Sequence, residues 1–194
     1  MVWIKYFCFD PLISKTKQPS KYQDLLLRSI LKANKGTVYG KQLGLERINS
    51  YRDFSATVNV HTYEDLRMLI ENQEIKKKPM LNAEQPIMYA QTSGTTGEPK
   101  LIPVTSEFKE TLQDMSRVWL RRAQQDHKNM LDHTILSVVS PAIEGHTYSG
   151  QPYGAMSGIT YKHMPKILKA QYTLPYSVME LQDYDLRYLV MMRL

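Results

Sequence analysis

The chain has little cysteine and no long apolar run. Cys8 is the one cysteine among its 194 residues, so no internal disulfide can form, as is usual in reducing compartments. No stretch approaches the ~20 apolar residues of a membrane-spanning helix. The apolar start at residues 1–10 is interrupted by Lys5 and Asp10 and is too short for a signal sequence. These absences predict a cytoplasmic protein without a membrane partner.

The sequence also lacks the patterns that metal ions and nucleic acids require. Its histidines, cysteine and carboxylates form no group with metal-ligand spacing, so we predict no metal ligand. The formal net charge is +6, from 25 Lys and Arg against 19 Asp and Glu, and the basic residues are dispersed. The one tight basic run, Lys76–Lys78, follows a predicted helix, whose dipole favours cations there. Aromatic and basic residues do not alternate as on an RNA-binding surface. We therefore expect no nucleic-acid partner.

The segment Thr92–Lys100 is the most informative part of the chain. It reads Thr-Ser-Gly-Thr-Thr-Gly-Glu-Pro-Lys. Its glycines permit backbone conformations in which successive N–H groups surround an anion. Its hydroxyls add donors, and its lysine supplies a point charge suited to phosphate. The segment therefore predicts a site for the phosphates of a nucleotide. The residues of this site are Thr92, Ser93, Gly94, Thr95, Thr96, Gly97 and Lys100.

Simpler interpretations of this segment remain open. Clusters of Gly, Ser and Thr also form ordinary turns. Lys100 could pair with Glu98 and hold the loop instead of binding phosphate. The flanking residues 86–91 and 101–104 each predict a short strand, so the segment joins the strands of a β-hairpin, and a helix begins only after it. This arrangement excludes the Walker-type phosphate loop, which opens directly into a helix.

Residues 92–100 resemble the phosphate-binding signature of the acyl-adenylate-forming superfamily, which includes acyl-CoA synthetases, luciferases and peptide-synthetase adenylation domains. Residues 99–103 and 57–67 are similar to the auxin-responsive Gretchen Hagen family of acyl acid–amido synthetases, in a form nearer its bacterial members. Residues 34–40 and 48–54 fit the amino-terminal region of the same family. The resemblance extends from about residue 20 to the end of the chain, and only the phosphate segment is highly specific.

The resemblance implies a two-step reaction that uses ATP and Mg²⁺. A carboxylate attacks the α-phosphate of ATP, forming an acyl-adenylate and releasing pyrophosphate. An amine, usually that of an amino acid, then displaces AMP and forms an amide. The implied partners are a small carboxylic acid and an amino acid or amine. Two alternatives remain: an acyl-CoA or aryl-CoA ligase of the same superfamily, and a non-catalytic, truncated binding module.

The resemblance further implies that the helix after the hairpin lines the acid-binding site. Trp119 or Leu120 falls closest to the position where plant members carry an arginine, which argues against an auxin-like or benzoate-like acid. An arginine of this helix could hold the substrate carboxylate bidentately. The candidates for contact with the acid are Trp119, Leu120 and Arg121, with Arg117 and Arg122 nearby. The simpler alternative is a core tryptophan beside solvated arginines. The expected opposite wall is the strand end at Ser140 with Tyr148, Ser149 and Tyr153.

Alternating helix and strand patterns predict an α/β fold. We expect helices at 22–32, 63–73, 107–127, 164–170 and 177–194, a buried strand at 134–140, and a loop at 144–158. With the resemblance, the fold becomes part of an adenylate-forming, luciferase-like large domain, with helices packed on a mostly parallel sheet and the phosphate segment in a hairpin.

The whole chain, residues 1–194, is interpreted as a partial amino-terminal adenylation domain without the carboxy-terminal domain. Residues 1–20 are expected to be a poorly ordered or irregular arm. The amphipathic end at 185–194 has no polar tail, which suggests a fragment. The resemblance implies that contacts to adenine, ribose and Mg²⁺ follow later in the sequence. We therefore assign no catalytic residue and expect the chain alone to be inactive.

Overall fold

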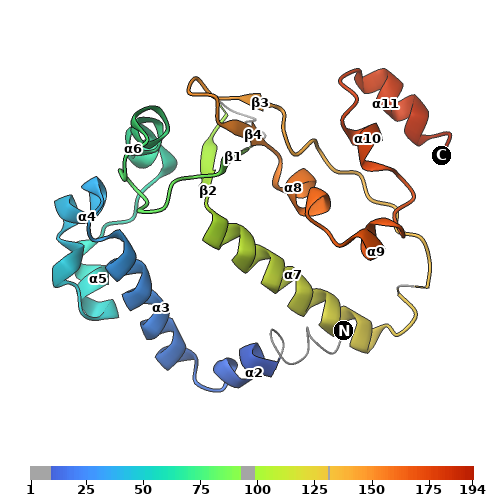
Figure 1. Ribbon diagram of the computed structural model, residues 1–194. Helices are drawn as coiled ribbons and strands as arrows, with labels where there is room; N and C mark the ends of the chain where they lie inside the picture. The colour runs from blue at the N-terminus through green and yellow to red at the C-terminus, as the bar shows by residue number, and fades with distance from the viewer. Residues whose placement is uncertain (1–9, 93–98, 131) are drawn as a thin grey trace. The chain divides into compact units, whose positions relative to one another are not determined.

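The computed structural model describes residues 10–92, 99–130 and 132–194. The chain divides into two compact units, one of Met1–Ile87 with Pro103–Phe108, and one of Met88–Ile102 with Lys109–Leu194. The helices are α2 (Asp10–Thr16), α3 (Pro19–Asn34), α4 (Val38–Leu43), the 3-10 helix η2 (Leu45–Arg47), α5 (Tyr51–Thr57), α6 (Tyr63–Lys76), α7 (Ser106–Asp126), α8 (Met156–Lys162), α9 (Lys166–Lys169), α10 (Tyr176–Met179) and α11 (Tyr184–Met191) (Figure 1). The strands are β1 (Met88–Gln91), β2 (Leu101–Val104), β3 (Gly145–His146) and β4 (Pro152–Gly154).

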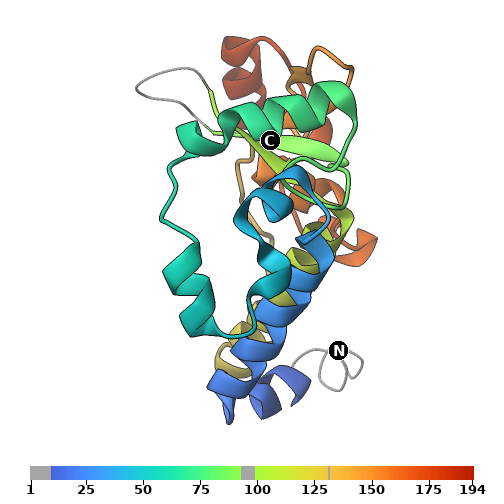
Figure 2. The same cartoon turned by 90° about the vertical axis from the view of Figure 1, so that its left-hand side faces the viewer.

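The first unit is mainly helical (Figure 2). Its core contains the buried side chains of Leu31 from α3, Leu45 from η2, and Ile48, against which partly buried apolar side chains of α3, α4 and α5 pack. The hydroxyl of Thr37 accepts a hydrogen bond from the N–H of Gly40 at 2.9 Å and so begins α4. A helix cap and a small apolar core therefore both stabilise the first unit.

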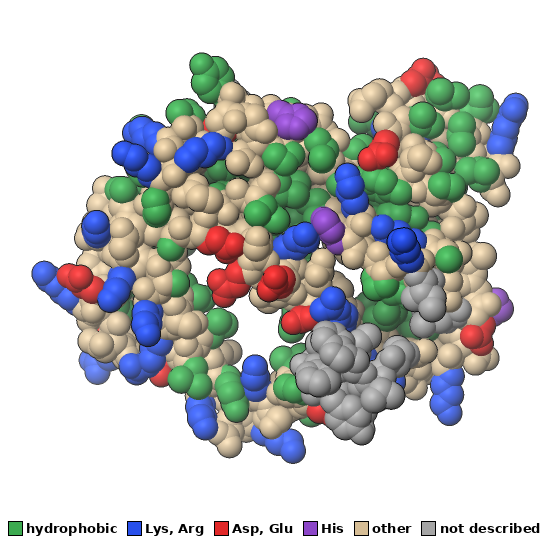
Figure 3. Space-filling model, in the orientation of Figure 1, with side chains coloured by type: hydrophobic (Ala, Val, Ile, Leu, Met, Phe, Trp, Pro, Cys, Tyr) green, Lys and Arg blue, Asp and Glu red, His purple; other side chains and the backbone are tan. Residues whose placement is uncertain are grey.

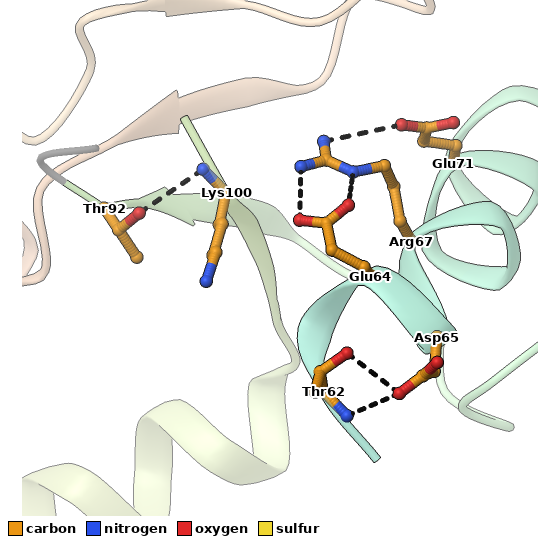
Figure 4. A network of polar contacts seen from close by, with 7 residues as sticks. All are labelled: Thr62, Glu64, Asp65, Arg67, Glu71, Thr92 and Lys100. Atoms are coloured by element: carbon orange, nitrogen blue, oxygen red, sulfur yellow. Dashed lines mark hydrogen bonds and ion pairs between the residues drawn. The ribbon is translucent and has the colours of Figure 1, made fainter. Parts of the chain in front are cut away.

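Helix α6 begins with a capping box formed by Thr62 and Asp65. The Asp65 carboxylate accepts hydrogen bonds from the backbone N–H of Thr62 at 2.7 Å and from the Thr62 hydroxyl at 2.8 Å (Figure 4). These two bonds lower the pKa of Asp65 from its ordinary value. The helix runs past its predicted end near residue 73 and stops at Lys77, whose φ of 52° is left-handed.

A buried amide organises the segment between α6 and β1. Gln73 is only 2% exposed. Its Oε1 atom accepts hydrogen bonds from three consecutive backbone N–H groups, those of Met80, Leu81 and Asn82, at 2.8–3.2 Å. Its Nε2 atom donates to the carbonyls of Asn82 and Glu84 at 3.1 and 3.3 Å. Both ends of this side chain therefore hold the backbone that leads into β1.

The same segment connects to the beginning of α7. Oε1 of Glu84 accepts a hydrogen bond from the N–H of Ser106 at 3.0 Å, and its Oε2 accepts from that of Glu107 at 3.5 Å. A carboxylate at a helix N-terminus is favourable because it faces unpaired N–H groups and the positive end of the dipole. The N–H of Ile87 donates to the carbonyl of Val104 at 2.9 Å. These contacts fix the base of the hairpin that carries the phosphate segment.

The described strands form a sheet in the order β2–β1–β4–β3, which lies in the second unit except for the last two residues of β2. Strands β1 and β4 are parallel, with Tyr89 opposite Tyr153, and β3 and β4 are antiparallel. The three residues Met88, Tyr89 and Ala90 of β1 are buried, and Tyr89 is 1% exposed. The α/β class is confirmed, and the described strands form a mixed sheet where a mostly parallel one was expected.

The predicted buried strand at residues 134–140 is wrong. Ile135 alone forms a β-bridge, with Tyr172, while Leu136 and Val138 are 73% and 61% exposed. The apolar, β-branched pattern of this segment suits a strand, but a strand also needs a neighbour for its backbone groups. No strand of the described residues pairs with 136–140.

Three other predictions need correction. Residues 144–158 contain β3, β4 and the start of α8, where a loop was expected. The expected helix at 177–194 is divided into α10 and α11, because Asp183 accepts a hydrogen bond from the N–H of Leu186 at 3.0 Å and begins a new helix. Within the expected irregular arm, residues 10–16 are helical and Pro19 begins α3, a position that suits proline. Residues 1–9 lie outside the described residues.

We predict that Gln73→Met lowers the free energy of unfolding by about 3 kcal/mol or more, because it leaves several buried backbone groups without their partners. Urea denaturation measures the change. The matched control is Gln42→Met, on the exposed surface of α4, which should stay within about 0.5 kcal/mol of the original chain. Equal effects of the two substitutions would show that the Gln73 amide does not organise this segment.

Candidate nucleotide and acid site

The two ends of the phosphate segment face each other across a hairpin. The N–H of Thr92 donates to the carbonyl of Lys100 at 3.1 Å, and the Thr92 hydroxyl accepts from the N–H of Lys100 at 3.3 Å (Figure 4). Strands β1 and β2 are neighbours in the sheet, so the predicted strand–loop–strand arrangement is confirmed. Thr92 and Lys100 are both exposed. The other predicted phosphate ligands, Ser93, Gly94, Thr95, Thr96 and Gly97, lie outside the described residues.

A second segment reaches the same edge of the sheet as Thr92. Because β1 and β4 are parallel, their carboxyl ends coincide. Thr92 follows β1, and Ala155 follows β4 and precedes α8. In parallel α/β sheets, ligands bind beyond the carboxyl ends of the strands. Thr92 and the start of α8 therefore lie at the same edge of the sheet.

Sequence reasoning missed the segment around Ala155. Its signal is a pair of glycines at close backbone approaches. A Cβ atom at Gly154 would meet the backbone of Ala142 and Ile143, and one at Gly158 would meet the backbone of residues 140–142. Only glycine leaves room for two backbones to pass so closely. These contacts place the turn from β4 into α8 against residues 140–143.

The residues expected to form the opposite wall are divided between the two edges of the sheet. Tyr148 and Ser149 lie in the turn between β3 and β4, which precedes β4 and so belongs to the other edge of the sheet. The side chain of Tyr148 is 96% exposed. Tyr153 lies within β4, in register with Tyr89. Ser140, which is exposed, lies beside the start of α8 at the edge that carries Thr92.

Helix α7 carries the predicted acid contacts. It has no fully buried residue among those described, and Trp119 is 66% exposed, so the interpretation of Trp119 as a core residue is wrong. Leu120 and Arg121 are half-buried. Together with the exposed Phe108 and Met115, Trp119 leaves much of the apolar side of this helix uncovered by described residues.

The three arginines of α7 differ in their surroundings. Arg117 pairs with Asp114 at 2.6 Å and Arg122 with Asp126 at 3.1 Å, both one turn away on the same helix. The Nε atom of Arg121, in contrast, is buried and has no hydrogen-bond acceptor among the described residues. A buried guanidinium N–H without an acceptor is costly. Arg121 therefore differs from its two neighbours in having a buried N–H group without an acceptor in the described part of the chain.

The described residues contain no group of three or more His, Cys, Asp and Glu side chains that could hold a metal ion. None of the described helices is long and apolar enough to cross a membrane.

A model of the GH3 family N-terminal domain matches residues 9–194. Similar proteins include the indole-3-acetic acid-amido synthetase GH3.2 of Arabidopsis thaliana, 34% identical over 96 residues, and the jasmonoyl-L-amino acid synthetase JAR4 of Nicotiana attenuata, 32% identical over 98 residues. The matched regions cover 47% and 50% of this chain and 17% of each relative.

Solved structures of the same family have a similar fold. GH3.15 acyl acid amido synthetase matches with a TM-score of 0.74 at 20% identity, over 93% of this chain and 31% of that chain. AtGH3.15 acyl acid amido synthetase in complex with 2,4-DB matches with a TM-score of 0.63 at 24% identity, over 82% of this chain and 27% of that one. The chain therefore has the fold of part of these proteins and spans less than a third of their length.

We predict that Thr92→Val raises the hydrogen-exchange rate of the Lys100 amide about threefold to tenfold, because valine offers no acceptor to that N–H. Amide exchange followed by NMR measures the rate. Thr92→Ser keeps the hydroxyl and is the control, with an exchange rate near that of the original chain. Equal rates in the two variants would contradict a role for the hydroxyl in closing the hairpin.

Proposed function

Because the chain belongs to the GH3 family, whose N-terminal domain matches residues 9–194, we propose that it is part of an ATP-dependent acid–amino acid ligase. A carboxylate attacks the α-phosphate of ATP and releases pyrophosphate, and an amine then displaces AMP from the acyl-adenylate to leave an amide. The observation that carries the proposal is the phosphate-binding sequence at 92–100, attached to the carboxyl end of the buried strand β1.

In this proposal the phosphate segment supplies preorganised donors to the ATP phosphates. The residues assigned to them are Thr92, Ser93, Gly94, Thr95, Thr96, Gly97 and Lys100. Donors fixed by the fold stabilise the charge that develops on the phosphates without reorganising during the reaction. The paired backbones of Thr92 and Lys100 support this role, because they hold both ends of the segment in place.

Mg²⁺ enters the proposal together with the nucleotide. Such ions are held largely by substrate phosphates, with one or two carboxylates and several waters. The described residues contain no cluster of three or more possible ligands, so no residue of this chain is assigned to the metal. The ion would neutralise phosphate charge during attack by the acid.

The acid is assigned to α7, near Trp119, Leu120 and Arg121. Arg121 would hold the carboxylate, since the buried Nε atom has no acceptor of its own among the described residues. Trp119 would offer an apolar surface, which its 66% exposure leaves available. The chemical class of substrate is a small carboxylic acid with an apolar body, to be joined to an amino acid or amine.

The chain spans only 17% of the length of the curated relatives over the matched regions, so the full activity is proposed for the product of the whole coding sequence. We expect that product, a cytoplasmic enzyme, to release pyrophosphate only when acid is present and to form an amide with an amino acid. The 194-residue chain alone should bind ATP without turnover. Formation of a CoA thioester and no amide would identify an acyl-CoA ligase. ATP binding without reaction in the whole product would identify a binding module.

Lys100→Gln is expected to weaken ATP binding about tenfold, since it removes a cation beside the phosphates. Isothermal titration calorimetry measures the affinity. Lys128→Gln removes the same charge from an exposed site after α7 and should leave the affinity within about twofold. If Lys100 instead only holds the hairpin, the substitution lowers the melting temperature and leaves ATP affinity unchanged, and its assignment to phosphate is overturned.

Arg121→Met is expected to weaken binding of carboxylates about tenfold or more, because it removes a charged donor while keeping much of the side-chain volume. Saturation-transfer NMR with a panel of aliphatic and aromatic carboxylates, in the presence of ATP and Mg²⁺, measures binding. Arg122→Met is the matched control, because Arg122 already pairs with Asp126. Equal loss in the two variants, or no loss in either, contradicts the assignment of Arg121.

A further inference from the structure

Four basic side chains from three helical segments come together in the second unit. They are Lys109 of α7, Lys162 at the end of α8, His163, which follows it, and Lys169 at the end of α9. We call this group the cation cluster. Figure 3 shows a histidine with Lys or Arg side chains around it over the region of α8 and α9.

The ends of α8 and α9 are held together within the cluster. The Lys169 ammonium donates a hydrogen bond to the carbonyl of Lys162 at 2.7 Å. The N–H of His163 donates to the carbonyl of Ile159 at 3.1 Å and so closes the last turn of α8. Lys109 and Lys169 are half-buried, whereas Lys162 and His163 are exposed. The cluster therefore combines fixed backbone geometry with two side chains open to solvent.

The charges of the cluster repel one another. Partial burial, and then repulsion from Lys109, Lys162 and Lys169, lowers the pKa of His163 from its ordinary value. These lysines come from α7, from α8 itself and from α9, so positive charge faces His163 from each of the three segments.

The cation cluster has no ion pair with a carboxylate in the described part of the chain. Among the described residues, none of the ion pairs includes a member of the cation cluster, although both Arg117 and Arg122 of α7 have acidic partners. Cations at a helix C-terminus are favourable, which accounts for Lys162 at the end of α8 and for Lys169, which ends α9 and bonds the last carbonyl of α8. That explanation does not extend to Lys109, which comes from the first turns of a different helix.

We propose that the cation cluster is a binding site for a soluble anion that carries two or more phosphate groups. Ammonium groups are strong point charges suited to phosphate, and a single carboxylate could neutralise only one of them. A multivalent anion would instead meet several members of the cluster at once and relieve their mutual repulsion. The inference concerns residues that the proposed ligase reaction does not use.

Pyrophosphate, titrated into the 194-residue chain at constant ionic strength, tests the proposal by calorimetry. We expect saturable binding that Lys109→Gln and Lys162→Gln each weaken about threefold to fivefold. Lys128→Gln removes one charge elsewhere in the same unit and should not change the affinity. Lys100→Gln should also leave the pyrophosphate affinity unchanged, because Lys100 belongs to the phosphate segment and not to the cation cluster. Loss of binding in Lys100→Gln alone, or equal loss in all variants, overturns the proposal, whatever the outcome for the ligase activity.

The imidazole of His163 provides an independent readout. Sulfate, a dianion throughout the pH range used, should raise the pKa of His163 and leave the other four histidines unchanged in an NMR titration, with His163→Gln identifying the signal. Sulfate should also bind more tightly as the pH falls through the lowered pKa of His163, because protonation of the imidazole adds a cation. Equal pKa shifts of all five histidines, which general screening by salt would give, contradict the proposal.

A lipid headgroup is the other source of clustered phosphates. Vesicles of phosphatidylcholine with and without a phosphoinositide, in a flotation assay, distinguish it from a soluble ligand. Binding of pyrophosphate without recruitment to vesicles is the expected result. Recruitment to phosphoinositide vesicles together with no response to pyrophosphate overturns the assignment to a soluble anion.

Discussion

The pairing of β1 on both of its sides is the constraint on which the second unit depends. On one side β1 forms the hairpin with β2, and on the other it is parallel to β4. This double pairing explains why Met88, Tyr89 and Ala90 are buried although the sheet has only four short strands. It also fixes the direction in which the chain leaves β1 at Thr92. The position of the candidate phosphate segment is therefore set by β1, three of whose four residues are buried.

The proposed acid contact on α7 depends on which of its arginines have acidic partners. On α7, Asp114 and Asp126 satisfy two arginines locally, while the buried Nε of Arg121 has no acceptor among the described residues. An acid substrate and a phosphate ligand make opposite demands on the protein. The acid needs one directed donor beside an apolar surface, whereas phosphate needs several donors and diffuse positive charge. In the proposed function, α7 would supply the first arrangement and the segment 92–100 the second.

Local signals made much of the fold predictable. Thr62 and Asp65 form the capping box that their spacing indicates, and the pattern at 86–104 gave both strands of the hairpin. The failures concern long-range pairing. Residues 134–140 have the composition of a buried strand, yet Ile135 alone finds a β partner, and the short strand β4 shows no periodicity that a sequence pattern could reveal. The buried Nε of Arg121 could not be distinguished from those of its neighbours, because burial depends on tertiary packing.

The parallel pairing of β1 and β4 also affects how the protein is made. Tyr89 and Tyr153 are in register but lie 64 positions apart in the chain (153 − 89). At roughly 5–20 residues per second, a ribosome needs roughly 3–13 s to add the chain between them. The hairpin with β2 can close without this delay, since it is complete by Val104. Meanwhile the other edge of β1 presents unpaired backbone groups and apolar side chains to neighbouring nascent chains. Slow translation between the two strands therefore lengthens the time during which this edge of β1 stays unpaired.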